Sequence, residues 1–320
     1  MRMVGTAHPT IMNKSIAGVL PVVHTPFHDD DTIDLESLER QIDGAFAEGA
    51  DGCCTGMVSE LLRLTYHERI ELTKRLAALN QGRGVVVIGV GAESTKQAIE
   101  YAQCAEQAGC DAIMAIPPIS TALPAQQTFD YFRDLADAVS LPLIVQDASS
   151  YVGQEIPMAV SIELLTVYGE DKILFKPEAS PIGPKLSELR DATAGKARIF
   201  EGSGGICLVD SFRRGIVGTI PGMEFLPAVV ALWKALQKGD EAAIYRIYLP
   251  LCALVALQLQ AGLDGFLAVE KYVLQKRGIF ATARRRKPFA WELDEETRQE
   301  LERLLELLEA ATAADYTTGG

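Results

Sequence analysis

Eight short apolar runs alternate along the sequence with longer segments that have the periodicity of amphipathic helices. The runs are rich in Val, Ile or Ala and occupy residues 16–23, 52–55, 85–90, 112–116, 143–145, 173–175, 197–201 and 216–220. Between them, apolar residues recur at three- and four-residue spacing over 35–48, 66–79, 94–108, 126–139 and 158–168, which predicts helices. Continuous apolar strands that alternate with helices indicate a parallel sheet buried on both faces.

Eight strand–helix units predict an α/β protein of the (β/α)8 TIM barrel type. An open, doubly wound sheet is the alternative, and such a sheet usually carries a GxGxxG motif after its first strand. The best match here, residues 89–94, has two of the three glycines and follows the third strand instead. The barrel is therefore the favoured architecture.

The sequence continues with helical patterns after the eighth strand. Residues 225–237 have the pattern of the eighth barrel helix, and 240–312 are predicted to be all helical. We expect a loose tail at 1–14, the barrel at 15–238, a C-terminal helical extension at 239–312 and a second loose tail at 313–320. The basic run 284–287 is predicted to be a solvated connector between the helices of the extension.

Composition excludes several classes of partner and site. The formal net charge is −13, which disfavours binding to nucleic acid or to anionic membranes. No uninterrupted apolar run approaches the roughly 18 residues of a membrane span. The six cysteines form no CxxC pair and the four histidines form no HxH or HExxH motif. We therefore expect a cytoplasmic protein with free thiols, no metal and no cofactor.

Reactive groups in a TIM barrel lie at the carboxyl ends of the strands and in the loops that follow them. Lys176 follows the sixth apolar run and precedes Pro177, which holds it extended at the barrel mouth. A partly desolvated amine in that position would be a nucleophile. The alternative is a surface lysine that merely ends a strand, and position alone does not choose between the two.

Other polar residues near strand ends also have two interpretations. Glu60 and Asp147 are expected to serve as caps or ion-pair partners rather than in chemistry. Gln146 ends the fifth buried strand, where a polar amide needs partners. The loop 202–205 (GSGG) is either a tight turn or a set of backbone donors for an anion.

Eight segments make the sequence similar to the dihydrodipicolinate synthase / N-acetylneuraminate lyase family of class I, Schiff-base-forming enzymes. They are 18–27 (GVLPVVHTPF), 51–60 (DGCCTGMVSE), 89–95 (GVGAEST), 108–118 (AGCDAIMAIPP), 141–147 (LPLIVQD), 175–179 (FKPEA), 200–205 and 215–222. The resemblance implies a TIM barrel with a C-terminal helical extension, with Lys176 as the Schiff-base lysine. It also implies that the loop 56–60 binds the substrate carboxylate.

Several positions depart from the pattern of the family's synthases. Met57 and Val58 replace the loop hydroxyls, Gln146 replaces the strand-five tyrosine, Ser120 replaces a second tyrosine, and Tyr151 replaces an arginine. These departures speak against dihydrodipicolinate synthase and sialic acid lyase activity. The pattern is most similar to the branch of the family that contains 2-keto-3-deoxy-L-arabonate dehydratase, which also lacks the strand-five tyrosine.

The resemblance therefore implies a Schiff-base lyase that dehydrates or cleaves a 2-keto-3-deoxy sugar acid, as a homotetramer built from two dimers. The alternatives are pyruvate condensation of the dihydrodipicolinate synthase type, or a non-catalytic family member that binds a 2-oxo acid. The expected catalytic residues are Lys176, Glu178 as general base and Gln146. The expected substrate-binding residues are Val58, Ser59, Gly202, Ser203 and Ile220.

Overall fold

Eight short parallel strands form a closed ring in the computed structural model, which describes residues 15–313. The strands are β1 (Gly18–Val19), β2 (Gly52–Cys54), β3 (Val85–Gly89), β4 (Ala112–Ala115), β5 (Leu143–Asp147), β6 (Ile173–Pro177), β7 (Phe200–Glu201) and β8 (Gly218–Thr219). Strands β2 to β6 pair in chain order, and β8 lies between β1 and β7. Single parallel bridges, Val22 to Cys54 and Phe175 to Ile199, join these two groups. The predicted TIM barrel is confirmed.

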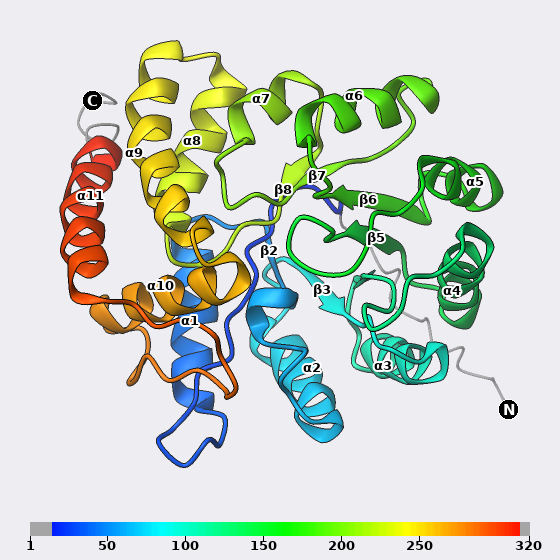
Figure 1. Ribbon diagram of the computed structural model, residues 1–320, viewed down its shortest axis with the longest axis horizontal. Helices are drawn as coiled ribbons and strands as arrows, with labels where there is room; N and C mark the ends of the chain where they lie inside the picture. The colour runs from blue at the N-terminus through cyan, green and yellow to red at the C-terminus, as the bar shows by residue number, and fades with distance from the viewer. Residues whose placement is uncertain (1–14, 314–320) are drawn as a thin grey trace, which may run out of the picture.

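Helices cover the outside of the ring (Figure 1). They are α1 (Leu35–Ala47), α2 (Tyr66–Asn80), α3 (Thr95–Gln107), α4 (Ala125–Ala138), α5 (Met158–Tyr168), α6 (Ile182–Ala192), α7 (Leu208–Arg213) and α8 (Leu226–Lys238), with a short 3₁₀ turn, η1 (Met57–Ser59), after β2. Polar side chains fix where helices begin: Asp34 accepts from the Ser37 N–H, and Thr65 and Glu68 form a reciprocal cap. Such caps satisfy N–H groups that have no partner within the helix.

Both faces of the strands are buried, in alternation. Ile144 and Leu174 belong to an apolar cluster inside the ring, whereas Val145 and Phe175 pack against the surrounding helices. Because successive side chains point to opposite faces of a strand, the position two residues beyond Ile144 or Leu174 faces the barrel interior again. The polar residue at each of these positions, near the ends of β5 and β6, therefore points into the barrel.

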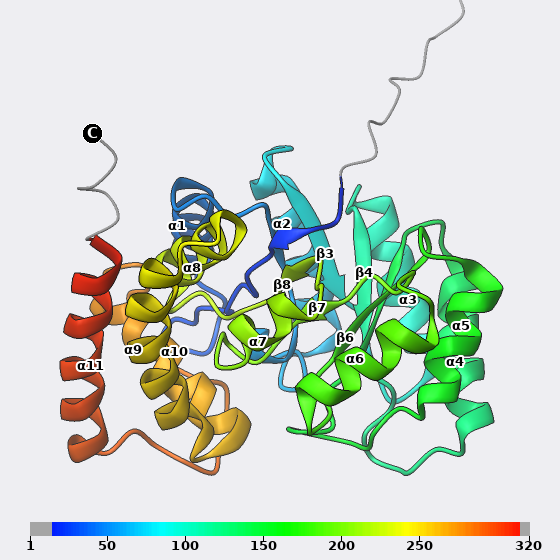
Figure 2. The same ribbon diagram turned by 90° about the horizontal axis from the view of Figure 1, so that it is seen from above.

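The C-terminal extension stands beside the barrel, against α8 and α1. It consists of α9 (Glu241–Leu259), α10 (Gly262–Lys276) and α11 (Glu295–Ala313), which lie together on one side in both views (Figures 1 and 2). The predicted boundary at 238/239 falls between α8 and α9. The predicted tails, 1–14 and 313–320, lie outside the described residues except for Ala313, which ends α11.

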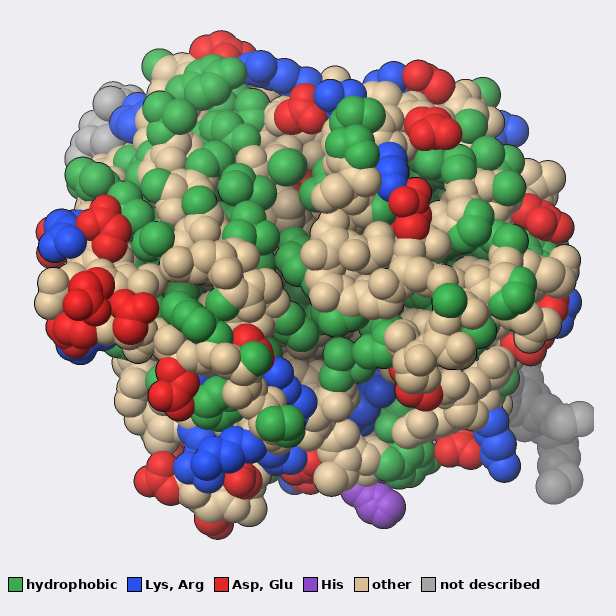
Figure 3. All heavy atoms as spheres, in the orientation of Figure 1, with side chains coloured by type: hydrophobic (Ala, Val, Ile, Leu, Met, Phe, Trp, Pro, Cys, Tyr) green, Lys and Arg blue, Asp and Glu red, His purple; other side chains and the backbone are tan. Residues whose placement is uncertain are grey.

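Helix α9 is strongly apolar, although no uninterrupted apolar run in the sequence approaches the length of a membrane span. Its 19 residues reach a mean hydropathy of 1.6, long and apolar enough by composition alone to cross a membrane. One face, which includes Ile247, Leu251 and Leu254, is fully buried in the protein. The opposite face leaves Leu249 63% exposed, and hydrophobic side chains gather over α8 and α9 (Figure 3).

The segment 277–294 corrects two expectations, because it is neither helical nor a solvated connector. The Arg286 N–H donates to Glu60 Oε2 at 2.8 Å, and the guanidinium of Arg286 pairs with Glu68 at 2.7 Å. Arg284 pairs with Asp31 at 2.7 Å. The basic residues thus tie the segment to the loops that follow β1 and β2 and to the first turn of α2 (Tyr66–Asn80). These specific acidic partners explain why the segment does not remain in solvent.

Glu68→Gln should destabilise the protein at neutral pH by about 1–2 kcal/mol, a value reduced for solvent screening of this partly exposed pair. The Arg286 guanidinium holds the pKa of Glu68 at about 2. A carboxyl group whose pKa is lower in the folded protein than its ordinary value of 4.5 stabilises the folded state. This stabilisation is present above pH 4.5 and is lost as the pH falls towards 2. Urea denaturation should therefore show a difference between variant and parent at pH 7 that shrinks below pH 4. Glu71→Gln, which alters an exposed pair on the same helix, should show almost no difference, and an equal effect of both variants would contradict the assignment.

Candidate active site

Lys176 and Gln146 point into the barrel because of their register on β6 and β5. They are direct neighbours in the β5–β6 ladder, and each lies two residues beyond an interior apolar residue, Leu174 and Ile144. The side chain of Lys176 is 6% exposed. Two strands that run parallel thus bring an amine and an amide side by side at the carboxyl end of the sheet.

A buried carboxyl group connects these two side chains. Glu178 Oε2 lies 3.0 Å from Lys176 Nζ and accepts a hydrogen bond of 2.6 Å from Gln146 Nε2. Burial raises the pKa of Glu178, although Lys176 and Gln146 oppose the shift. A carboxyl group whose protonated form is favoured beside an amine is suited to taking up and returning a proton.

Gly202, in the loop after β7, lies directly against this group. A Cβ atom at this position would fall 2.4 Å from Lys176 Cε and 2.6 Å from Glu178 Oε1. Contacts that short do not occur between real atoms, so a side chain would displace the lysine or the glutamate. The loop 202–205 thus approaches Lys176 so closely that only glycine fits at position 202.

Lys176 lines a cavity of about 50 Å³ that lies between the barrel mouth and α10. Of the predicted site residues, the structure brings six to its wall: Lys176, Glu178, Gln146, Val58, Gly202 and Ile220. The wall also contains residues that the sequence reasoning did not assign to the site: Val22, Met57, Tyr151, Gly204, Pro221, Gly222, Leu263, Phe266 and Glu270. Leu263, Phe266 and Glu270 lie on one face of α10 at helical spacing, so the extension completes the cavity.

Ser59 and Ser203 do not line this cavity. The Ser59 hydroxyl donates to Val23 O and accepts from the Gly56 N–H, while the Ser59 N–H donates to Gly56 O. The N–H groups at the start of this short turn, including that of Val58, have no partner within it. The predicted carboxylate site is thus better served by Val58 than by Ser59.

The Ser203 hydroxyl also turns to the protein rather than to the cavity. Its N–H and its hydroxyl both donate to Glu201 Oε1, and its oxygen accepts from the Cys207 N–H. These contacts shape the loop that carries Gly202. They leave Ser203 no evident contact with a substrate.

Glu60 has the structural role expected for it, and its partner is a second buried lysine. Lys271 Nζ lies 2.5 Å from Glu60 Oε1 and donates to Thr25 O at 2.5 Å and Arg284 O at 2.9 Å. All three protons of the ammonium group are therefore engaged. Lys271 differs in this respect from Lys176, whose amine faces the cavity.

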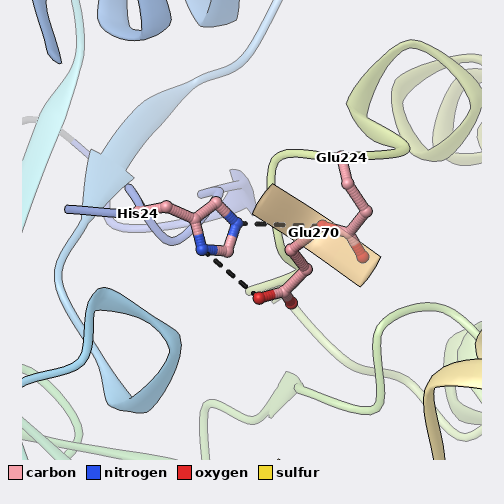
Figure 4. A group of neighbouring side chains, drawn as sticks. All are labelled: His24, Glu224 and Glu270. Carbon is pink, nitrogen blue, oxygen red and sulfur yellow. Dashed lines mark ion pairs between the residues drawn. The ribbon is translucent and has the colours of Figure 1, made fainter. Parts of the chain in front are cut away.

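A second cluster of titratable groups lies next to the cavity. His24, Glu224 and Glu270 are all buried, and one candidate ligand atom from each lies within 4.8 Å of the others. Figure 4 shows the imidazole between the two carboxyl groups, with one ring nitrogen towards each. Sequence spacing alone excluded a site at the histidines, but these residues come from three distant segments, so no local motif could reveal them.

Tyr151 brings a phenol to the cavity from the loop after β5. Its ring meets Phe266 edge to face at 5.8 Å between centroids, and burial raises the pKa of its hydroxyl. The family's strand-five tyrosine is Gln146 here, so Tyr151 is the aromatic hydroxyl that this wall offers.

A sequence profile of the dihydrodipicolinate synthetase family matches residues 15–308, which is almost all of the described chain. The chain belongs to the dihydrodipicolinate synthetase family. It is accordingly an enzyme, a lyase, and the family resemblance seen in its motifs is confirmed.

Two relatives and one solved structure are similar to the chain over most of its length. It is 30% identical to L-2-keto-3-deoxyarabonate dehydratase of Azospirillum brasilense, over 89% of this chain and 92% of that protein. It is 26% identical to the probable 2-dehydro-3-deoxy-D-pentonate aldolase YjhH of Escherichia coli K12, over 83% and 89%. YagE, a family member from E. coli K12 solved with pyruvate, superposes with a TM-score of 0.84 at 25% identity, over 92% and 99% of the two chains.

Proposed function

We propose that this lyase removes water from a 2-keto-3-deoxy sugar acid through a Schiff base on Lys176. The observation that carries the proposal is the contact of 3.0 Å between Lys176 Nζ and Glu178 Oε2. This contact places a proton-transfer group next to the atom that would bond to the substrate. The dehydratase relative from A. brasilense supports the same reaction class.

The reaction begins when the neutral amine of Lys176 attacks the C2 ketone and water leaves, which forms an iminium ion. The Val58 N–H would hold the substrate carboxylate. Glu178 then takes a proton from C3, and the C3–H electron pair moves into a C2–C3 double bond to give an enamine. The enamine expels the C4 hydroxyl, which takes a proton from an acid in the cavity and leaves as water. Hydrolysis of the resulting unsaturated iminium frees the product and Lys176.

The position of Glu178 favours dehydration over aldol cleavage. In the iminium, C3 is two bonds from the lysine nitrogen, so a carboxyl group in contact with that nitrogen lies close to the C3 hydrogen. Aldol cleavage needs a base at the C4 hydroxyl, which is farther from the nitrogen. Gln146 has no titrating group, so it would orient a hydroxyl rather than move a proton. Cleavage remains the second candidate, supported by the probable aldolase relative.

A substrate panel separates the candidates. Purified enzyme would be offered 2-keto-3-deoxy pentonates and hexonates of both configurations, as well as pyruvate with aldehydes, and the products identified by mass spectrometry. Dehydration yields a product that has lost one water, whereas cleavage yields pyruvate and an aldehyde. Binding of 2-oxo acids without product would instead support a non-catalytic role.

Glu178→Gln should slow dehydration by about 10²–10⁴-fold, because a glutamine cannot accept the C3 proton. Formation of the lysine adduct should persist, since the amide preserves size and contacts. Borohydride reduction with pyruvate followed by intact-mass measurement checks the adduct, and steady-state kinetics check turnover. Gln146→Ala is the comparison and should mainly weaken discrimination among substrates. Normal turnover by the Glu178 variant would place the base elsewhere.

We also propose that the protein is an oligomer, with a homotetramer as the form expected from the family. The apolar outer face of α9, with Tyr245 40% and Leu249 63% exposed, is a candidate contact surface. Light scattering at micromolar concentration should give a mass several times that of one chain. A monomeric mass would remove this proposal.

A further inference from the structure

We propose that Glu270 is the acid that donates a proton to the departing C4 hydroxyl, with His24 and Glu224 packed behind it to hold it in position. This inference rests on the proposed dehydration and adds a second acid–base residue to it. Glu178 and Glu270 would then divide the two proton transfers between them.

Glu270 reaches the substrate cavity from α10. Its side chain is 1% exposed, and it lines the same cavity as Lys176 and Glu178. Gly222, in the wall of that cavity, leaves room for the carboxyl group of Glu270. A Cβ atom at position 222 would lie 2.9 Å from Glu270 Oε1 and 2.2 Å from Glu224 Oε2. The absence of a side chain at 222 therefore lets a carboxyl group of the C-terminal extension face the reacting molecule.

The surroundings of Glu270 favour its protonated form. Burial, followed by the negative charge of Glu224, raises its pKa well above the ordinary value. The titratable or charged groups around it are His24, Tyr151, Glu60, Glu224 and Lys271, and Lys176 and Glu178 line the same cavity. The ammonium group of Lys271 is paired with Glu60. A carboxyl group whose protonated form is favoured in this way is suited to assist the departure of a hydroxyl.

His24 lies between the two carboxyl groups (Figure 4), with its Nδ1 3.3 Å from Glu270 Oε2 and its Nε2 3.9 Å from Glu224 Oε2. The Nδ1–H donates to Val58 O at 3.0 Å, and Nε2 accepts from the Met223 N–H at 3.3 Å. Both ring nitrogens are thus engaged with the protein. We therefore assign His24 to holding Glu270 in position rather than to holding a metal ion.

The proton transfers balance within one turnover. Glu178 gains the C3 proton, and the C4–O bond breaks as the proton of Glu270 passes to the oxygen, so that water leaves and Glu270 becomes a carboxylate. The electron pair of the enamine becomes the C3–C4 double bond, and the iminium is restored. After the product leaves, Glu178 gives up the proton it gained and Glu270 takes one up, both by exchange with water, so the two carboxyl groups return to their starting states.

The test compares Glu270→Gln with Glu178→Gln in two assays. The first follows dehydration of the best sugar acid, and the second follows exchange of the methyl hydrogens of pyruvate in D2O, which needs only the enamine. Glu270→Gln should lose about 10²-fold or more in dehydration and keep methyl exchange and borohydride adduct formation within about threefold of the parent. Glu178→Gln should lose both dehydration and exchange.

Three results would overturn the assignment of Glu270. Dehydration at the parent rate by Glu270→Gln would overturn it while leaving the proposed function intact. Loss of parent activity on chelation, regained with a divalent ion, would overturn it in favour of a metal at His24. Absence of dehydration by the parent on every panel member would overturn the proposed function and this inference together.

A second variant decides the matter if Glu270→Gln does not fold, as judged by thermal melting and by adduct formation. Glu270→Asp retains an acid but withdraws it by one methylene. It should slow dehydration by at least about tenfold while methyl exchange remains at the parent level. Parent-level dehydration by Glu270→Asp would overturn the assignment.

Discussion

Lys176→Ala should abolish turnover, with a loss on the order of 10⁴-fold or more, because covalent catalysis is lost completely with its nucleophile. The fold should be retained, since Lys176 lies at a strand end and its side chain lines a cavity rather than the packed interior. Steady-state kinetics and a thermal melt together check both statements.

Two comparisons make the Lys176 result specific. Lys196→Ala removes an exposed lysine and should turn over normally. Lys271 is the other buried lysine near the site, but Glu60, Thr25 and Arg284 occupy its three protons, so it should not substitute for Lys176. Residual activity above about one per cent in Lys176→Ala would contradict the Schiff-base account.

Gly202→Ala should reduce dehydration by about 10²-fold, because even a displacement of about 1 Å at a reacting group has that effect. The added methyl group would meet Lys176 Cε at 2.4 Å and Glu178 Oε1 at 2.6 Å. The backbone at 202 is not in the left-handed region, so alanine causes no backbone strain there and the expected effect comes only from the steric clash. Kinetics of adduct formation, followed by quenching with borohydride, would show the loss at the first chemical step.

Gly44→Ala is the matched control for this variant. Gly44 lies within α1, and a Cβ atom there would meet nothing within 4 Å. Replacement of a helical glycine by alanine should leave activity unchanged and raise stability slightly. If Gly202→Ala forms the adduct as fast as Gly44→Ala does, the close approach of the β7 loop to Lys176 has no functional role.

The barrel, and the position of Lys176 and Gln146 at the centre of its candidate site, were predictable from the sequence because both depend on local periodicity. The regular alternation of strands and helices specifies the architecture. A polar residue at the end of an apolar strand is expected at the carboxyl end of the barrel, where the site lies. Lys176 and Gln146 follow from that rule alone. Their contact through Glu178 follows from the short spacing between 176 and 178.

The rest of the site depends on contacts between distant segments, which periodicity does not encode. Glu270 stands in what reads as an ordinary helix, and His24 looks like one residue of a loop, yet the two lie 3.3 Å apart. The basic run at 284–287 reads as solvated until its acidic partners Asp31, Glu60 and Glu68 are in place. Ser59 and Ser203 lie in the predicted loops, but their hydroxyls are satisfied by neighbouring backbone and by Glu201.

The most direct test of the account is to locate the reduced adduct on the chain. The enzyme would be incubated with pyruvate or its best 2-oxo acid, treated with borohydride and digested, and the modified peptide sequenced by mass spectrometry. The account predicts a single modified residue, Lys176, and no modification when borohydride or the 2-oxo acid is omitted. Turnover without any adduct, or an adduct on another lysine such as Lys271, would contradict it.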